Sequence, residues 1–318
     1  MHESIGLVNM TNVVTPTQGN QFLVPNFAPI TYQDYNANGT GGTFGTGNAV
    51  VQNPALTQAS ITATPAVAQT AFDIFYGWTT SFQLAATLGA ELGESFAEKV
   101  DQRVAAAFTS FKATPLNTYY AASADGFTRV LSLGAMELMP SGASLTANAK
   151  AGFTSATVTQ MIRDVKQNWK VARMPGNPVV VIDSNGNDGV IGSTLNRLLS
   201  ELTGGAISQA GGSNLSALGN ELLTSGKIEN IYGCQVMATT FLPATTRTVM
   251  NSNVAILSNV VVGSYFGDSA VFTVLKEGLA LKQGEVPGGL QIWLTGVGYF
   301  GAGVGDLRRG GAINIVQV

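Results

Sequence analysis

The feature that most constrains this chain is a long helical pattern over residues 82–111, whose large apolar residues recur every four positions from Leu84 to Phe108. Four residues advance an α-helix by about 400°, so the apolar stripe drifts by roughly 40° per step. A helix of this length, about 45 Å, is therefore predicted to be contacted on different sides along its course. Because Gly89 and Gly93 each cost about 1 kcal/mol relative to alanine, we also expect a neighbour to pack close to the backbone there.

The same helix carries a stripe of acidic residues. Glu91, Glu94, Glu98 and Asp101 fall within about 80° of one another when each residue turns the helix by about 100°. Four like charges on one face repel one another. Two interpretations stay open at this point: a solvated face, or a docking strip for basic side chains of another segment or subunit.

The chain is poor in charge and unevenly charged. Charged residues make up 11% of its 318 residues, against roughly 25% in ordinary soluble domains. The first 98 residues hold six carboxylates and no Lys or Arg, so that all 16 basic residues begin at Lys99. A chain with so little charge either aggregates or buries its uncharged surface against other subunits.

The composition also argues against several classes of function. One cysteine, Cys234, excludes an internal disulfide framework and a multi-cysteine zinc site. The only histidine, His2, lies beside the first residue and is a poor candidate for catalysis. We therefore predict no catalytic residue, no metal and no cofactor. The N-terminus lacks the basic segment of a signal peptide, no apolar run is long enough to span a membrane, and the net charge of −3 argues against a dedicated nucleic-acid binder.

Two glycine-rich motifs suggest nucleotide chemistry only superficially. The segment GVGYFG at 296–301 matches the dinucleotide-binding spacing, but no helical pattern follows it, so we interpret it as a place where two backbones approach closely. The stretch 34–50 holds five glycines. It contains no lysine, which a phosphate-binding loop would need. Asp183 and Asp188, in VVVIDSNGNDG, are interpreted as turn formers. An enzyme would instead require a deep pocket around Asp183 or Gly296.

The remaining patterns predict a mixed fold. Residues 1–24 are read as a loose arm, followed by two strands that the glycine-rich stretch joins into a protruding two-stranded arm. An amphipathic helix is predicted over 154–172, with Val158, Met161, Ile162, Val165 and Trp169 on its apolar face. The further predicted elements are strands at 27–35, 58–67 and 178–183, helices at 193–202 and 213–223, and several strands after residue 227. The first of these two helices is expected to end at Gly204. This order indicates an α+β chain.

In this order the parts resemble the major capsid proteins of tailed bacteriophages, which have the Hong Kong 97-type capsid fold. The segments that carry the resemblance follow the chain: QASITATPAV, TLGAELGESFAEKVDQRVAAAF, ATVTQMIRDVKQNW, PVVVIDS, LLTSGKIENIYGCQVMATTFLP, AVFTVLKEGLALK and WLTGVGYFGAGVGDLRRGGAINI. They cover nearly the whole chain. The resemblance implies an N-terminal arm, an extended β-hairpin loop, a peripheral domain with a long spine helix, and an axial domain.

The resemblance also divides the chain. It implies an N-terminal arm at 1–24, an extended loop at 25–65, a peripheral domain at 66–140 with the spine helix at 82–111, an axial domain at 141–262, and closing strands of the peripheral domain at 263–318. Some relatives link their subunits through a lysine in the extended loop. Residues 25–65 contain no lysine, so we expect no such crosslink here. The short arm implies that scaffolding is a separate protein.

The function implied is structural. The chain is expected to assemble with copies of itself, as pentamers and hexamers, into the icosahedral head shell that encloses double-stranded DNA without binding it specifically. A scaffolding protein, a portal and a decoration or cement protein are the other partners implied, with assembly in the host bacterial cytoplasm and a final location in the virion. The alternatives are another virion protein, such as a tail or decoration component, and an α/β nucleotide-binding enzyme.

The expected subunit interface pairs the acidic N-terminal third with basic side chains of a neighbour. On the acidic side we place Asp34 together with the stripe of Glu91, Glu94, Glu98 and Asp101. The basic candidates are Arg129, Lys150, Arg308 and Arg309. Sequence alone does not choose among them.

Overall fold

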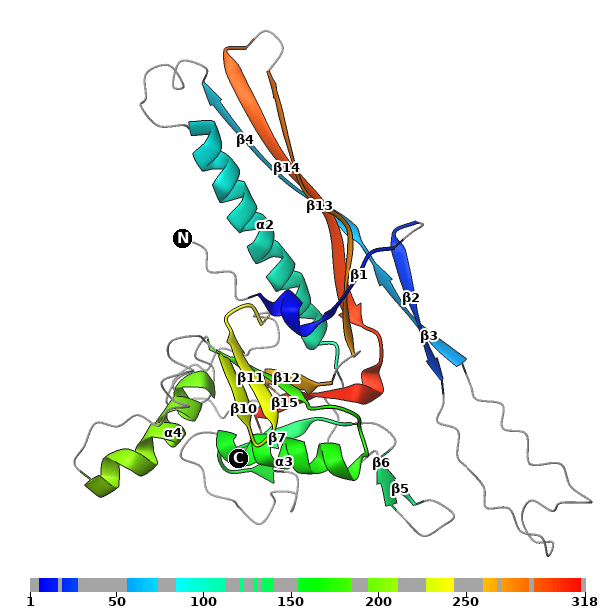
Figure 1. Ribbon diagram of the computed structural model, residues 1–318, viewed down its shortest axis with the longest axis vertical. Helices are drawn as coiled ribbons and strands as arrows, with labels where there is room; N and C mark the ends of the chain where they lie inside the picture. Colours follow the sequence, from blue (N-terminus) through cyan, green and yellow to red (C-terminus); the bar gives the residue numbers. More distant parts are fainter. Residues whose placement is uncertain are drawn as a thin grey trace, which may run out of the picture.

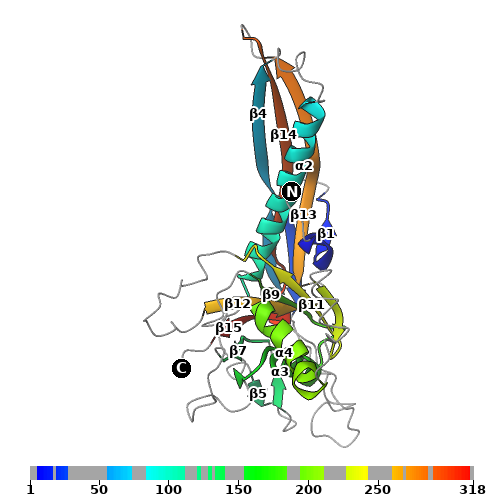
Figure 2. The ribbon, with the colours of Figure 1, turned by 90° about the vertical axis from the view of Figure 1, so that its left-hand side faces the viewer.

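The computed structural model describes thirteen stretches of the chain and has two main parts (Figures 1 and 2). One is a long projection of strands with a helix along it, and the other is a broader body of strands and helices at its base. The described residues are 6–16, 19–27, 56–73, 84–111, 120–122, 128–130, 133–139, 154–184, 194–210, 227–242, 260–267, 270–285 and 289–315.

The projection is a four-stranded sheet with helix α2 (Leu84–Phe108) on one side. Its strands, in spatial order, are β1 (Asn12–Val14), β13 (Val271–Glu285), β14 (Gln291–Val304) and β4 (Thr64–Asp73). Strands β13 and β14 form a long antiparallel hairpin, and β4 pairs antiparallel with β14 along its whole length. Strand β4 is therefore an edge of the sheet.

The body is a seven-stranded mixed sheet. Its strands, in spatial order, are β10 (Lys227–Ile231), β11 (Cys234–Thr239), β9 (Val179–Asp183), β12 (Val260–Phe266), β15 (Gly310–Ile315), β7 (Met136–Leu138) and β8 (Thr154–Ser155). Helices α3 (Val158–Val171) and α4 (Thr194–Ala210) contribute apolar residues to a core on one side of this sheet. The chain crosses from body to projection after β12 and returns after β14.

Two 3₁₀ helices and two two-stranded ribbons complete the described structure. The 3₁₀ helix η1 (Leu7–Met10) packs beside α2, and a second one, η4 (Leu307–Arg309), lies between β14 and β15. Strands β2 (Gln21–Phe27) and β3 (Leu56–Thr62) form a two-stranded ribbon, as do β5 (Tyr120–Ala122) and β6 (Thr128–Val130).

Helix α2 is contacted on different sides along its length, as its drifting stripe predicts. Near the middle of the helix, Phe96 packs edge-on against Phe300 of β14. Near its C-terminus, Phe108 stacks on Phe266 of β12, with ring centroids 4.7 Å apart. The helix ends at Phe108, three residues before the predicted end, because Thr109 and the next two residues donate hydrogen bonds to carbonyls three positions back.

Several local predictions are confirmed and others are wrong. The five apolar residues predicted for one face of α3 are the five that this helix buries, and β9 is buried at every position. Helix α4 continues past Gly204 and Gly205 to Ala210, because glycines weaken a helix without necessarily ending it. Residues 1–24 are not simply a loose arm, since β1 pairs with β13 and β2 begins at Gln21, six residues before the predicted strand.

The glycines of GVGYFG lie inside strand β14, which excludes a phosphate-binding loop there. A methyl group at Gly298 would meet the ring of Phe96 at 2.0 Å, and one at Gly301 would meet the Thr62 carbonyl oxygen at 2.2 Å. The close approach predicted for this motif is confirmed. At Gly89 and Gly93 the side chains of Leu281 and Leu279 would lie 3.7 and 3.9 Å from an added methyl group. A neighbour therefore packs there as expected, at an ordinary contact distance that leaves room for alanine.

The two sheets follow the domain boundaries implied by the resemblance only in part. The resemblance places residues 136–138 and 310–315 in the peripheral domain, yet both pair within the seven-stranded sheet of the body. Part of the glycine-tipped arm, its residues 28–55, lies outside the described residues, as does the predicted helix at 213–223. The domain boundaries stay a prediction.

Gly301→Ala should destabilise the subunit, because its methyl group would collide with backbone rather than with a movable side chain. We expect a loss of about 1–3 kcal/mol in the free energy of unfolding, measured by chemical denaturation. Gly278→Ala is the matched control in strand β13, where no atom lies within 4 Å of the added methyl group. Equal stability of the two variants would contradict the close-approach interpretation.

Candidate functional site

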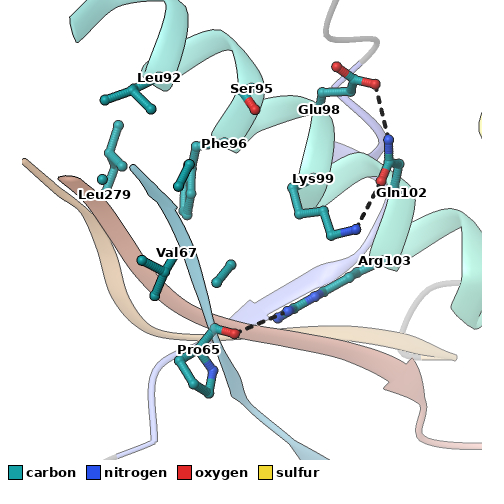
Figure 3. A pocket seen from close by; sticks show the side chains of 13 residues that line it. Pro65, Val67, Leu92, Ser95, Phe96, Glu98, Lys99, Gln102, Arg103 and Leu279 are labelled. Atoms are coloured by element: carbon teal, nitrogen blue, oxygen red, sulfur yellow. Dashed lines mark hydrogen bonds between the residues drawn. The ribbon is translucent and has the colours of Figure 1, made fainter. Parts of the chain in front are cut away.

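A groove lies between α2 and the edge strand β4, with a volume of about 500 Å³ (Figure 3). One wall is apolar and comes from β4, α2 and β13, where Val67, Phe96 and Leu279 lie close together. The other end is polar and comes from the next turns of α2. The lining residues are Pro65, Ala66, Val67, Ala68, Leu92, Ser95, Phe96, Glu98, Lys99, Gln102, Arg103, Leu279 and Gly296.

The edge strand beside this groove is long and open. Strand β4 has ten residues and carries no charge from Thr64 to Phe72. The side chain of Val67 is 63% exposed. In the part of the chain that the structure describes, β4 pairs only with β14. Natural proteins rarely leave such an edge unprotected, because its free backbone groups can pair with another chain.

Arg103 holds one end of the edge strand against the helix. Its guanidinium donates hydrogen bonds to the carbonyl oxygens of Thr64, at 2.9 Å, and Phe300, at 2.6 Å. It also lies over the Phe300 ring, 4.2 Å from the centroid, in a cation–π contact. Burial lowers the pKa of Arg103, but arginine stays charged in proteins.

The polar side chains at this end are linked along one face of α2. Lys99 Nζ donates to Gln102 Oε1 at 3.2 Å, and Gln102 Nε2 donates to Glu98 Oε1 at 3.0 Å. Glu98 is therefore engaged within its own helix. Lys99 itself is exposed, so it still presents positive charge at the end of the groove.

The predicted acidic stripe does not lie on one exposed face. Glu91 is exposed, Glu94 and Glu98 are half-buried, and Asp101 is only 1% exposed. Asp101 Oδ2 accepts a hydrogen bond from the Gly6 backbone nitrogen at 3.0 Å. The expectation that Asp101 contacts another subunit is replaced by this internal contact, which holds the N-terminal segment to α2.

The predicted basic candidates are only partly described. Arg308 and Arg309 lie between β14 and β15, and both form ion pairs with Asp306, at 2.9 and 3.4 Å. Their side chains remain about one-third exposed. Arg129 lies in β6 without a described side chain, and Asp34 and Lys150 lie outside the described residues.

The Asp306 cluster joins the two connections between body and projection. Gly305 N donates to Ala270 O at 2.8 Å, and Gly267 N donates to Arg309 O at 3.0 Å. Burial alone would raise the pKa of Asp306, but hydrogen bonds from Arg308 and the charges of Arg308 and Arg309 outweigh it, so the pKa lies below its ordinary value of 3.8. The carboxylate is thus held in its charged form.

Sequence reasoning missed the groove. Its lining combines residues near positions 66, 96, 279 and 296, and no local pattern brings such distant segments together. The one usable signal is the uncharged run from Thr64 to Phe72. Among the described residues, no group of His, Cys, Asp and Glu could hold a metal ion. None of the helices described is long and apolar enough to cross a membrane.

Because its pKa is lowered on folding, Asp306 should stabilise the subunit above its ordinary pKa, and this contribution should fade as pH falls through the lower folded value. Asp306→Asn should therefore lower the melting temperature at about pH 7 but change it little at about pH 2. Thermal unfolding of both proteins across this range is the measurement. A constant difference would contradict the assignment.

The chain is similar to known proteins in its structure rather than in its sequence. No family model and no curated protein matches the sequence. Among solved structures, the capsid of cyanophage P-SCSP1u matches with a TM-score of 0.63 and 17% identity over 97% of this chain and 87% of that one.

Two further structures agree with this match. The capsid of the native GTA particle matches with a TM-score of 0.61 and 12% identity, covering 99% of this chain and 91% of its own. The mature capsid of bacteriophage PhiM1 matches with a TM-score of 0.58 and 13% identity, covering 99% of this chain and 88% of its own. The chain, with its helix-lined projection and mixed-sheet body, has the fold of phage capsid proteins.

Proposed function

We propose that this protein is a structural subunit of a phage head shell, which assembles with copies of itself, through pentamers and hexamers, around a double-stranded DNA genome. The observation that carries the proposal is the open edge of β4 with the groove beside it. Strand β4 has ten residues, is largely solvent-exposed and carries no charge before Asp73. Such a strand offers a surface suited to burial against another chain. The likeness to phage capsids across 97% of the chain supports this role.

The groove suits an extended segment of a second copy. Backbone pairing along β4 would give affinity, and the apolar wall around Val67 and Phe96 would select side chains. The ribbon of β2 and β3 extends away from the body and offers such a segment (Figure 1). Leu23 on this ribbon is 51% exposed. In this arrangement the arm at 1–24 and the loop at 25–65 of one copy lie across its neighbour.

The charge distribution supports the same arrangement. The first 98 residues carry no Lys or Arg, whereas Lys99 lies exposed at the polar end of the groove. Opposite charges on the two surfaces steer copies together and favour one register. The function is structural rather than catalytic. The scaffolding, portal and decoration partners, assembly in the host cytoplasm and the virion location follow from the capsid assignment.

Electron microscopy of the purified, concentrated chain is the direct test of the proposal. Closed spherical particles are expected, whereas tubes would indicate a tail component. A monomer at every concentration would overturn the proposal.

Replacing Val67 by Ser should weaken assembly without unfolding the subunit. An exposed side chain contributes less than about 0.5 kcal/mol to the fold, but in a filled groove its loss removes apolar burial from every contact in the shell. We expect the concentration for half-maximal assembly, followed by light scattering, to rise several-fold. Leu307→Ser is the control, since Leu307 is 44% exposed and lies outside the groove. Equal assembly of the Val67 variant and the native chain would exclude the groove as an interface.

A further inference from the structure

A second surface, on the far side of the body from the projection, carries a cluster of basic side chains. Arg163, Lys166 and Lys170 of α3 fall within about 60° of one another around the helix axis. Arg173 lies two residues after Val171, the last residue of the helix, and is exposed. One acidic residue, Asp164, lies among them and pairs with Arg163 at 3.3 Å, which leaves a net positive surface. We call Arg163, Lys166, Lys170 and Arg173, together with Tyr232, the α3 surface.

Lys166 ties this helix face to two neighbouring turns. Its Nζ donates to Asn177 Oδ1 at 2.6 Å in the turn after α3, and to the Gly233 carbonyl oxygen at 3.4 Å in the hairpin between β10 and β11. The hairpin that holds Tyr232 and the segment at Asn177, four residues after Arg173, therefore both contact Lys166. The Tyr232 side chain is exposed, with 53% of its surface accessible.

Tyr232 occupies a backbone position that suits a different residue. Tyr232 and Gly233 form the two-residue turn between β10 and β11, with φ of 52° and 80°. Turns with two positive φ values favour Asn-Gly or Asp-Gly, because a bulky side chain at the first position is strained. Asn230 supports the turn by accepting a hydrogen bond from Gly233 N. The backbone of this turn therefore favours a smaller residue than tyrosine.

Arg173 presents the same conflict at the end of α3. Met174 N donates to Trp169 O at 3.1 Å and Arg173 N donates to Lys170 O at 3.0 Å, the two hydrogen bonds of a Schellman helix end. Arg173 occupies the left-handed position of this helix end, with φ of 55°. Glycine is the usual residue at that position. The helix end, like the hairpin, would be better formed by a smaller residue.

Of the described residues, Arg173 and Tyr232 are the two non-glycine residues with positive φ, and both have exposed side chains. Residues held in such conformations tend to mark functional surfaces, and Arg and Tyr are prominent among residues that dominate binding energy. We propose that the α3 surface is a second self-association site, and that it binds the acidic N-terminal third of another copy of this chain.

Charge complementarity selects this occupant. The first 98 residues hold six carboxylates and no basic residue, and every copy in an assembly supplies them in equal number. Glu91 shows that at least one of these carboxylates is exposed on α2. Because the whole chain carries a net charge of −3, it is a poorer partner for a nucleic-acid polyanion than for another copy of itself. The inference rests on the proposed function, since it adds a contact to the same assembly.

The test exploits the backbone conflict. Tyr232→Asn and Arg173→Gly each place a residue that the local backbone prefers while removing the side chain proposed to bind. The doubly substituted full-length chain should unfold at the same or a higher temperature than the native chain. Its self-association, measured by sedimentation on nuclease-treated protein, should require at least about tenfold more protein. Tyr232→Phe with Arg173→Lys keeps the ring and the charge, and should associate nearly as the native chain does.

The outcomes separate this inference from the shell proposal. Unchanged self-association of the Asn–Gly variant overturns the inference, and so does a lower unfolding temperature, because both residues would then serve the fold. Native chains that associate without forming closed particles would refute the shell, while weaker association of the variant would still support this contact. A native chain that stays monomeric refutes both. Loss of binding to a labelled DNA duplex, with self-association intact, would overturn the inference by assigning the surface to nucleic acid.

Discussion

The structure depends on helix α2 being long enough to serve two sheets at once. Phe96 packs against Phe300 in the projection, and twelve residues later Phe108 stacks on Phe266 in the body. Because a four-residue spacing drifts around the helix, one continuous stripe can face both partners. The two strand crossings beside Asp306 complete this junction. In the part of the chain that the structure describes, α2 thus connects the projection to the body through one continuous apolar stripe.

Local periodicity was enough to predict the elements whose burial is set by their own residues. The apolar face of α3 and the buried strand β9 follow from spacing and β-branched content alone. Strand β1 could not be predicted, because it exists through pairing with β13, some 260 residues away. The same limit applies to Gly298 and Gly301, where the pattern indicates a close approach but does not identify Phe96 or Thr62 as the neighbour.

The candidate site shows the same division between composition and placement. Counting charges predicted an acidic N-terminal third, but not that Asp101 would turn inward to hold Gly6. The ion pairs of Arg308 and Arg309 with Asp306 were equally invisible, since nothing in a short basic run tells whether its partner lies in the same chain. The groove needed the tertiary structure, because β4 and α2 form it together with Leu279 and Gly296, which lie about 200 residues further along the chain.

The open edge of β4 restricts where an added strand can pair with it, although its composition is uncharged. Pro65 has no backbone N–H to offer an added strand, and Arg103 already engages the carbonyl oxygen of Thr64. The first two residues of the edge are thus closed, and an incoming strand can pair only from Ala66 onward. Such partial blocking fixes where pairing starts, and a one-residue slip would turn every side chain of the added strand to the wrong face. An edge of this kind favours one repeated contact over unspecific aggregation, which is the property that a self-assembling subunit requires.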